Sequence, residues 1–312
     1  MLELILLVLG LLGLLLGSEL IIKGALNIAE HYKISHLFIG LTILAIGTDL
    51  PELVIAITGS IDKLMGIETS GLIIGDALGS CFGQIGLTLG IIGLFGVCCL
   101  TKRELLRDGL MMVGSVALLF LAGYDGELSR FEGIAFILIY LFYFMSLRRE
   151  EKIYEKIKRA PPMHLLWDAV SLIGGFAILI YSSNIVVENA ITLAQSWGIA
   201  QSLVGILIVG LGTSLPELAV SLGAIRKGAF RLSVGNLIGS NIFDILFTLG
   251  IGSVIAGFNV SRNLLRFDIP FLFVLSIIAL LFFRTKMKIA KKEAIILVLI
   301  YAVYVVLKLR GM

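Results

Sequence analysis

The sequence predicts an all-α polytopic membrane protein with ten transmembrane helices in two inverted-topology repeats of five helices each. Its composition, its distribution of charge and an internal repeat predict this class. The chain has 312 residues, of which 58% are hydrophobic and 15% charged, and its mean hydropathy of +1.05 is too high for a water-soluble globule. At roughly 20 residues per span, ten helices take up about two-thirds of the chain, which leaves no room for a soluble catalytic domain.

The same numbers exclude several classes of function. A net charge of +3 is too balanced for a nucleic-acid binder. The sequence has no GxxxxGK[ST] phosphate loop, which argues against an ATP-driven pump. Its three cysteines stand in or beside apolar segments without metal-type spacing. We therefore expect no enzymatic activity, no cofactor and no nucleic-acid partner, and we expect the lipid bilayer to be the environment of the chain.

Apolar runs between charged breaks predict the helices in chain order. The first run is kept as a span because Glu3 stands where a secretory signal carries basic residues. A hydrophilic stretch at 148–164 separates a first five-helix repeat, 1–147, from a second, 165–312. The predicted spans are 2–22, 37–60, 69–97, 107–123, 131–147, 165–187, 199–225, 232–257, 267–284 and 293–309.

The positive charges predict the orientation of these spans. Nineteen of the 25 Lys and Arg residues fall in loops on one side of the predicted membrane, and six fall on the other. Because positive loops stay in the cytoplasm, the linker 148–164 should be cytoplasmic and both termini extracellular. The linker carries no large insertion, so we expect a prokaryotic protein of the plasma membrane.

Two pairs of segments repeat within the chain. Residues 34–53 match 199–218 at an offset of 165, and both contain G-T-x-L-P-E; residues 75–90 match 235–250 at an offset of 160, and both contain G-x-x-x-G-S. Each half has an odd number of spans, so equivalent helices cross the membrane in opposite directions. Inverted repeats of this kind are typical of secondary transporters.

The first repeated motif places a carboxylate near the middle of a span. Glu52 and Glu217 would each cost at least about 2.5–3.5 kcal/mol if exposed to lipid, so something must compensate them. The preceding Pro51 and Pro216 break the helix and free backbone carbonyls. Carboxylate, hydroxyl and carbonyl oxygens together suit a hard cation such as Ca²⁺ or Na⁺.

The second repeated motif adds polar groups from the third and eighth spans. Ser80 and Ser240 offer hydroxyls, and Gln84 and Asp244 follow one helical turn later on the same face. We find no Lys or Arg deep within a predicted span near Asp244, so its carboxylate requires a bound cation or a proton.

These paired motifs, GTDLPEL with GDALGSCFGQIG and GTSLPEL with GNLIGSNIFDI, resemble the two α-repeats of the cation/Ca²⁺ exchanger superfamily, and are most similar to its prokaryotic Na⁺/Ca²⁺ exchanger branch. The resemblance covers nearly the whole chain. It implies that the first and sixth helices slide against a fixed core and that Ca²⁺ and Na⁺ compete for one midplane site. The ligands it implies are Glu52, Glu217, Asp244, Thr48, Thr213, Ser80, Ser214, Ser240 and the carbonyls of Ala45 and Gly210.

Three residues depart from the pattern that the resemblance implies. Asp49 stands where the second repeat has Ser214, Gln84 replaces an Asn, and Asp76 stands where the second repeat has Asn236. Asp49 and Glu52 are three residues apart, so like-charge repulsion could make a proton a co-substrate. We count Asp49 and Gln84 among the candidate cation ligands.

The sequence therefore predicts a secondary antiporter exchanging Na⁺ for Ca²⁺ by alternating access. H⁺- or K⁺-dependent exchange is the alternative that Asp49 and Asp244 leave open. A cation channel is disfavoured by the inverted repeat and the broken helices. An intramembrane enzyme has no nucleophile–base or metalloprotease motif in its favour. The oligomeric state leaves no trace in the sequence, and we expect the monomer to be functional.

Overall fold

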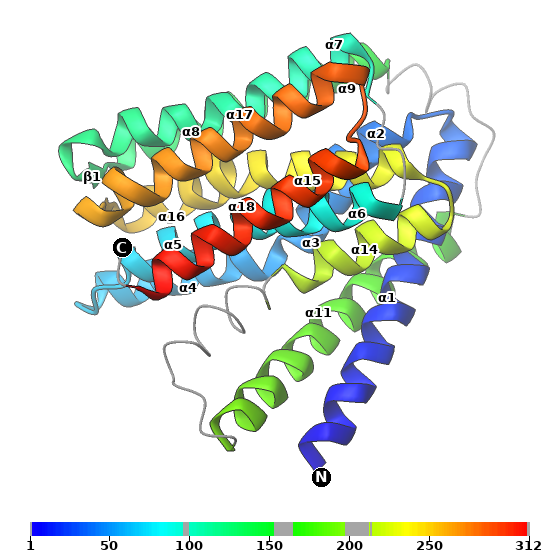
Figure 1. The fold of residues 1–312 in the computed structure, drawn as a ribbon, viewed down its shortest axis with the longest axis horizontal. Coiled ribbons are helices and arrows are strands. Elements are labelled where there is room, and N and C mark those ends of the chain that lie inside the picture. The colour runs from blue at the N-terminus through cyan, green and yellow to red at the C-terminus, as the bar shows by residue number, and fades with distance from the viewer. Residues whose placement is uncertain (1, 96–99, 153–164, 197–211, 213, 311–312) are drawn as a thin grey trace.

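A computed structural model describes all residues of the chain except 1, 96–99, 153–164, 197–211, 213 and 311–312. The described residues are mostly helical (Figure 1). The α-helices are α1 Leu2–Tyr32, α2 His36–Ile39, α3 Ala45–Thr48, α4 Leu50–Leu64, α5 Ser70–Phe82, α6 Leu89–Phe95, α7 Lys102–Glu104, α8 Leu110–Ala122, α9 Arg130–Glu151, α11 Leu165–Ser196, α14 Leu215–Arg226, α15 Phe230–Ile242, α16 Leu249–Ala256, α17 Ile269–Lys286 and α18 Lys291–Leu309.

Short irregular elements join these helices. In the described part of the chain, five π-helical turns run into the α-helices that follow them, a 3₁₀ turn follows α8, and two strands of two residues pair with each other. The π-helical turns are η1 Gly40–Leu44, η2 Gly83–Thr88, η3 Leu105–Gly109, η6 Phe243–Thr248 and η7 Leu264–Asp268; the 3₁₀ turn is η4 Gly123–Asp125, and the strands are β1 Glu127–Leu128 and β2 Phe258–Asn259.

Several of these helices are long and apolar enough to cross a membrane. Seven stretches of the described chain meet this test, and the pair His36–Thr48 and Leu50–Leu64, bent by 46°, makes an eighth if it is one span. Large apolar side chains cover the outer helices, among them Phe131, Phe142 and Leu121, which are 84%, 70% and 68% exposed. The chain is therefore a membrane protein with several spans, as its composition predicts.

Two spans form the centre of the molecule. The stretches Ser70–Phe95 and Phe230–Ala256 are the most enclosed of the seven, with 72% and 78% of their most apolar segment buried. Gly239 on α15 lies so close to the bent pair that a Cβ there would be 2.8 Å from Leu41 Cα and from Ala45 Cβ. Close approach through small residues is how membrane helices pack. It brings α15 against the break between α3 and α4.

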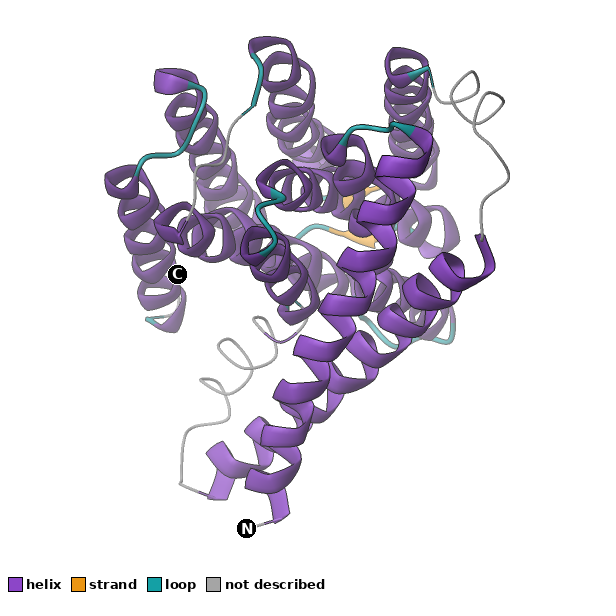
Figure 2. Cartoon of the chain, turned by 90° about the vertical axis from the view of Figure 1, so that its right-hand side faces the viewer, coloured by secondary structure: helices purple, strands orange, loops and turns teal. Residues whose placement is uncertain are grey.

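Helices α1 and α11 form a pair that leans away from the rest of the bundle (Figure 2). Glycines make the pair close-packed: a Cβ on Gly17 would be 2.9 Å from Leu179 N, and a Cβ on Gly175 would be 3.0 Å from Ile21 N. The Ser171 hydroxyl also donates a hydrogen bond to the Leu20 carbonyl at 2.9 Å. The two equivalent helices of the predicted repeats thus contact each other directly.

Some predicted boundaries are wrong. We placed the end of the first span at 22, but α1 continues to Tyr32, because Ala25 and Ala29 stay buried on one face while Lys23 lies exposed on another. Helix α11 continues to Ser196, beyond the predicted 187. Helix α9 extends to Glu151, so the predicted linker 148–164 begins inside a helix. The first half of the predicted span 199–225 lies outside the described residues, and its second half is α14.

The small strand pair also departs from the prediction, which was of an all-α chain. β1 and β2 are antiparallel, with Glu127 opposite Asn259 and Leu128 opposite Phe258. They are tied to the start of α5, because Asn259 N–H donates to Ser70 Oγ at 3.1 Å and Asn259 Nδ2 donates to Glu68 Oε2 at 2.9 Å. Hydrogen bonds from Ser70 to the carboxylate hold the pKa of Glu68 below its usual value. The strand pair therefore lies at the end of the molecule where α5 begins.

We predict from the α1–α11 contact that Gly175→Ala lowers the unfolding free energy by about 1–3 kcal/mol. The new methyl group must push Ile21 and the Gly17 carbonyl of α1 away from α11. Thermal unfolding of the purified protein in detergent micelles measures the effect as a lowered midpoint.

Gly174→Ala is the matched control on the same helix. No described residue lies within 4 Å of the position that its Cβ would take, so helix propensity alone should leave the stability unchanged or raise it slightly. Equal effects of the two substitutions would contradict the close packing of α1 on α11.

Candidate cation-binding site

The site is built on two helix breaks that share one backbone conformation. Asp49 separates α3 from α4 with φ −86° and ψ 9°, and Ser214 precedes α14 with φ −86° and ψ 4°. Pro51 and Pro216 follow in the first turn of the new helix, where a residue needs no N–H partner. The predicted proline break is thus confirmed in the first motif, and it places an acidic residue in the first turn of α4 and of α14.

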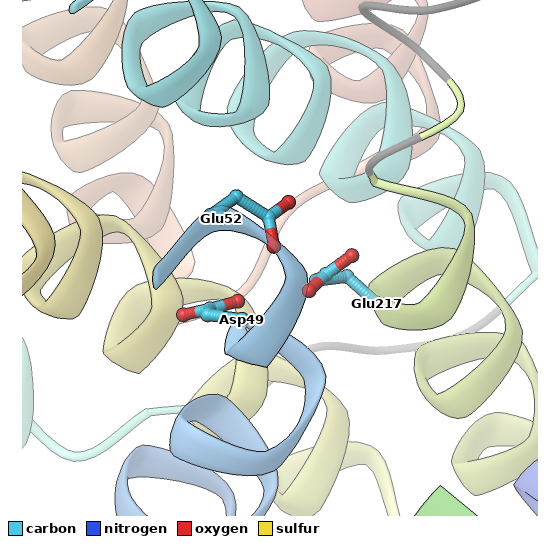
Figure 3. A group of neighbouring side chains, drawn as sticks. All are labelled: Asp49, Glu52 and Glu217. Carbon is cyan, nitrogen blue, oxygen red and sulfur yellow. The ribbon is translucent and has the colours of Figure 1, made fainter. Parts of the chain in front are cut away.

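The first turn of each new helix points its carboxylate at the other (Figure 3). Glu52 on α4, Glu217 on α14 and Asp49 at the break each offer one oxygen, and the three oxygens lie within 4.8 Å of one another. The three side chains are fully enclosed, with at most 1% of any one exposed. This cluster brings together three predicted ligands, of which Asp49 departs from the pattern that the resemblance implies.

The carboxylates in the cluster are largely unpartnered. Among the described residues, Asp49 Oδ2, Glu52 Oε2 and both carboxylate oxygens of Glu217 have no hydrogen-bond partner, and no ion pair in this part of the chain includes them. A buried charge without a partner is strongly destabilising. The cluster therefore needs cations or protons to neutralise it, and its oxygen ligands suit hard cations.

A chain of polar side chains continues from Glu52 toward Asp244. Ser80 Oγ donates to Glu52 Oε1 at 3.3 Å, and Ser214 Oγ donates to Ser80 Oγ at 3.3 Å. Gln84 Nε2 donates to Ser80 Oγ at 2.9 Å and approaches Asp244 Oδ2 at 3.5 Å. The structure thus brings Ser80, Ser214, Gln84 and Asp244 together with Glu52, as the sequence predicts.

Gln84 and Asp244 occupy the same place in two equivalent π-helical turns. Gln84 is the second residue of η2 and Asp244 is the second residue of η6. Both side chains are fully buried, and Asp244 Oδ1 has no hydrogen-bond partner among the described residues. A π-helical turn adds a residue to the helix and redirects the side chains there, and it is frequent at functional sites.

Thr48 and Ala45 lie on α3, before the break, and Ser240 lies on α15. The Thr48 hydroxyl donates back to the Leu44 carbonyl at 3.1 Å, and the Ala45 carbonyl accepts the Asp49 N–H at 3.1 Å. Ser240 is fully buried on α15 with a hydroxyl that has no partner among the described residues. These oxygens keep lone pairs for a cation. The remaining predicted ligands, Thr213 and Gly210, lie outside the described residues.

Asn241 and Asn236 contact the predicted ligands, but the sequence did not identify them as residues of the site. Asn241 Nδ2 donates to Gln84 Oε1 at 2.7 Å and so fixes the orientation of the amide. Asn236 Oδ1 lies 3.5 Å from Thr48 Oγ1, and Asn236 Nδ2 donates to Ser221 Oγ at 3.5 Å. Both are fully buried polar residues of α15, and a count of the polar residues on that span would have found them.

Comparison with known proteins gives one consistent family. The family model described as sodium/calcium exchanger protein matches residues 2–147 and 167–310. The sodium/calcium exchanger MaX1 of Methanosarcina acetivorans is 31% identical over 97% of this chain and 97% of its own length. The putative antiporter CaxA of Alkalimonas amylolytica is 35% identical over 79% of each chain.

A solved structure is similar over almost the whole chain. The sodium-calcium exchanger NCX_Mj, soaked with 2.5 mM Na⁺ and 0.1 mM Ca²⁺, has a TM-score of 0.82 at 28% identity and covers 98% of both chains. A long family match, a relative above 30% identity and a similar fold agree with the acidic cluster inside a bundle of apolar helices. The chain belongs to the sodium/calcium exchanger family of the cation/Ca²⁺ exchangers.

Proposed function

We propose that this protein is a secondary antiporter that exchanges Na⁺ for Ca²⁺ at the cluster formed by Asp49, Glu52 and Glu217 together with Asp244. The observation that carries the proposal is the set of buried carboxylate oxygens without a basic partner in the described chain. The family is one of transporters, and the similar NCX_Mj structure was soaked with Na⁺ and Ca²⁺, which supports the same two ions here.

The proposed ligands surround this cluster. Glu52 and Glu217 are shared by Ca²⁺ and Na⁺, hydroxyls and carbonyls complete the Na⁺ sites, and Asp244 and Gln84 close the site on the side of η2 and η6. The full proposed set is Ala45, Thr48, Asp49, Glu52, Ser80, Gln84, Gly210, Thr213, Ser214, Glu217, Ser240 and Asp244.

We also propose ten spans in two inverted repeats, 1–147 and 165–312, joined by a cytoplasmic linker 148–164. Asp49 and Ser214, 165 residues apart, share their φ and ψ values, and the turns η2 and η6 begin 160 residues apart; both offsets are those of the sequence repeat. With both termini outside, the positive loops face the cytoplasm. The monomer in the plasma membrane would be the working unit.

The α1–α11 pair is the proposed moving part. Two of its contacts lie beside the breaks: the ring of Phe176 occupies the space beside Gly47, where a Cβ would be 2.1 Å from Phe176 Cζ, and Ser183 Oγ donates to the Gly212 carbonyl at 3.1 Å. Gly47 and Gly212 flank the two breaks. A shift of this pair would therefore open or cover the site from one side of the membrane at a time.

Exchange without leak follows from the charge of the cluster. An empty site holds several adjacent carboxylates in a low-dielectric interior, and enclosing them is costly. The protein can thus reorient only after cations have neutralised the site, which couples the outward flux of Ca²⁺ to the inward flux of Na⁺ without hydrolysis of a nucleotide.

Asp49 favours an alternative in which an ion other than Na⁺ is also coupled to Ca²⁺. It adds a carboxylate to the cluster where the equivalent position of the other repeat carries Ser214. An extra negative charge requires an extra positive one, so H⁺- or K⁺-dependent Ca²⁺ exchange is the alternative. This alternative concerns the ions that are coupled and leaves the site the same.

Glu52→Gln or Glu217→Gln should abolish Na⁺-gradient-driven Ca²⁺ uptake into reconstituted vesicles, because the neutral amide cannot balance the cation's charge. Ca²⁺ at 100 times its dissociation constant should stabilise the wild type against thermal unfolding by about 2.7 kcal/mol, and this stabilisation should vanish in both variants.

Glu30→Gln removes an exposed carboxylate from α1 and serves as the control, with uptake and stabilisation as in the wild type. Transport at the wild-type rate in either Glu52→Gln or Glu217→Gln would rule out the proposed site.

Gradients of Na⁺, K⁺ and pH imposed one at a time should show that Na⁺ drives Ca²⁺ uptake, and Asp49→Ser should keep this Na⁺-driven flux while losing any requirement for K⁺ or H⁺. The measurement is Ca²⁺ uptake in the same vesicles under each gradient. Uptake driven by a pH gradient alone, in the absence of Na⁺, would favour the proton-coupled alternative.

A further inference from the structure

Two buried amide side chains, Asn241 and Gln84, form a hydrogen-bonded pair beside the acidic cluster. Asn241 Nδ2 on α15 donates to Gln84 Oε1 at 2.7 Å and to the Leu237 carbonyl at 2.8 Å. On its other side, Gln84 Nε2 donates to Ser80 Oγ at 2.9 Å and approaches Asp244 Oδ2 at 3.5 Å. Both amide side chains are fully buried. The pair therefore connects a backbone carbonyl of α15 to two of the proposed ligands.

Acceptors at both ends fix the orientation of this amide pair. One atom of the Asn241 amide contacts both Gln84 and the Leu237 carbonyl. Because a carbonyl can only accept a hydrogen bond, that atom is the amide nitrogen, and Gln84 faces it with its oxygen. The nitrogen of Gln84 then faces Ser80 and the acceptor oxygens of Asp244. Turning either amide over would bring two donors or two acceptors together.

This orientation keeps two proposed ligand oxygens from a cation. Gln84 Oε1 is engaged by Asn241. Ser80 Oγ accepts hydrogen bonds from Gln84 Nε2 at 2.9 Å and from Ser214 Oγ at 3.3 Å. A hydroxyl oxygen has two lone pairs, so both of those on Ser80 are taken. Turning the Gln84 amide over would free both oxygens at once.

The hydrogen bond from Asn241 opposes this turn. Rotation about the last torsion of Gln84 exchanges Oε1 and Nε2 without moving the rest of the side chain, and torsions of this type are soft. A small cavity, lined by the amide pair and by apolar side chains such as Met112, leaves space beside it. After the turn, Gln84 Nε2 would face Asn241 Nδ2, and Asn241 is held in place by the Leu237 carbonyl. The turn therefore costs the bond between the two amides.

We infer that Asn241 is a positioning residue that holds the Gln84 oxygen away from the transported cations and thereby weakens their binding. This inference rests on the proposed function, because it assumes that Gln84 and Ser80 are ligands of those cations. A cation that uses the Gln84 oxygen replaces the hydrogen bond from Asn241, and this bond forms again when the cation leaves. Asn241 thus favours release of the ion, which an exchanger needs as much as it needs binding.

Asn241→Leu removes the donor and keeps the shape of the side chain, because both side chains branch at Cγ and have the same number of heavy atoms. Gln84 Oε1 then lacks this buried partner, and a bound cation can replace it. The dissociation constant for Ca²⁺, measured at equilibrium on the purified protein in Na⁺-free buffer, should fall by about 2- to 10-fold, the range that one hydrogen bond is worth. The loss of a direct ligand would raise it instead.

The tighter binding should depend on Gln84. In a Gln84→Met background, Asn241→Leu should leave the dissociation constant for Ca²⁺ where Gln84→Met alone puts it. Asn241→Cys is a second variant, which introduces the residue that the first repeat carries at the equivalent position, Cys81. Because a thiol is only a weak donor, this variant should also lower the dissociation constant, and it tests the same role if the leucine variant does not fold.

Ser253→Ala is the matched control on the same span. It removes another buried polar group, a hydroxyl that donates to the Gly250 carbonyl at 3.1 Å, and it should leave the dissociation constant unchanged. An unchanged or raised dissociation constant in Asn241→Leu, or an equal fall in the Gln84→Met background, would overturn the role of Asn241 while leaving the exchanger function standing. A wild-type protein that binds no Ca²⁺ would overturn the proposed function itself.

Discussion

The repulsion between buried carboxylates governs this structure. Asp49, Glu52 and Glu217 present oxygens within 4.8 Å of one another. At an effective dielectric constant of about 20, two unit charges at that separation repel by about 3.5 kcal/mol. Three such pairs approach the whole stability of an ordinary domain, about 5–15 kcal/mol. A cluster of this charge is compatible with a folded protein only when cations or protons occupy it, so ion binding and a closed site are linked.

The rest of the bundle places these charges and surrounds them with oxygens. Pro51 and Pro216 lie in the first turn of the helix that follows each break, and these turns direct Glu52 and Glu217 toward each other. The π-helical turns place Gln84 and Asp244 at equivalent points, and glycine contacts bring α15 against the break at Asp49. The two repeats nevertheless differ in charge: Asp49 and Asp76 are acidic where the second repeat has Ser214 and Asn236. Asp49 is one of the three carboxylates of the cluster.

The acidic site could be predicted from the sequence because a carboxylate in an apolar span stands out against its neighbours. Glu52, Glu217 and Asp244 were visible for this reason, and the proline before each glutamate predicted the break. The positions of Asn241 and Phe176 could not be predicted, since their contacts join segments far apart in the chain. The end of α1 was missed because the exposed Lys23 resembles a loop residue, although Ala25 and Ala29 continue the buried face. Strands of two residues are too short to show a pattern.

The most direct test of the account is equilibrium binding of Ca²⁺ to the purified protein at increasing Na⁺ concentration. Because both ions are proposed to use the carboxylates of Glu52 and Glu217, the apparent dissociation constant for Ca²⁺ should rise steeply with Na⁺ and should not rise with N-methylglucamine. An apparent dissociation constant that is independent of Na⁺ would contradict the claim that the two ions compete for one acidic site.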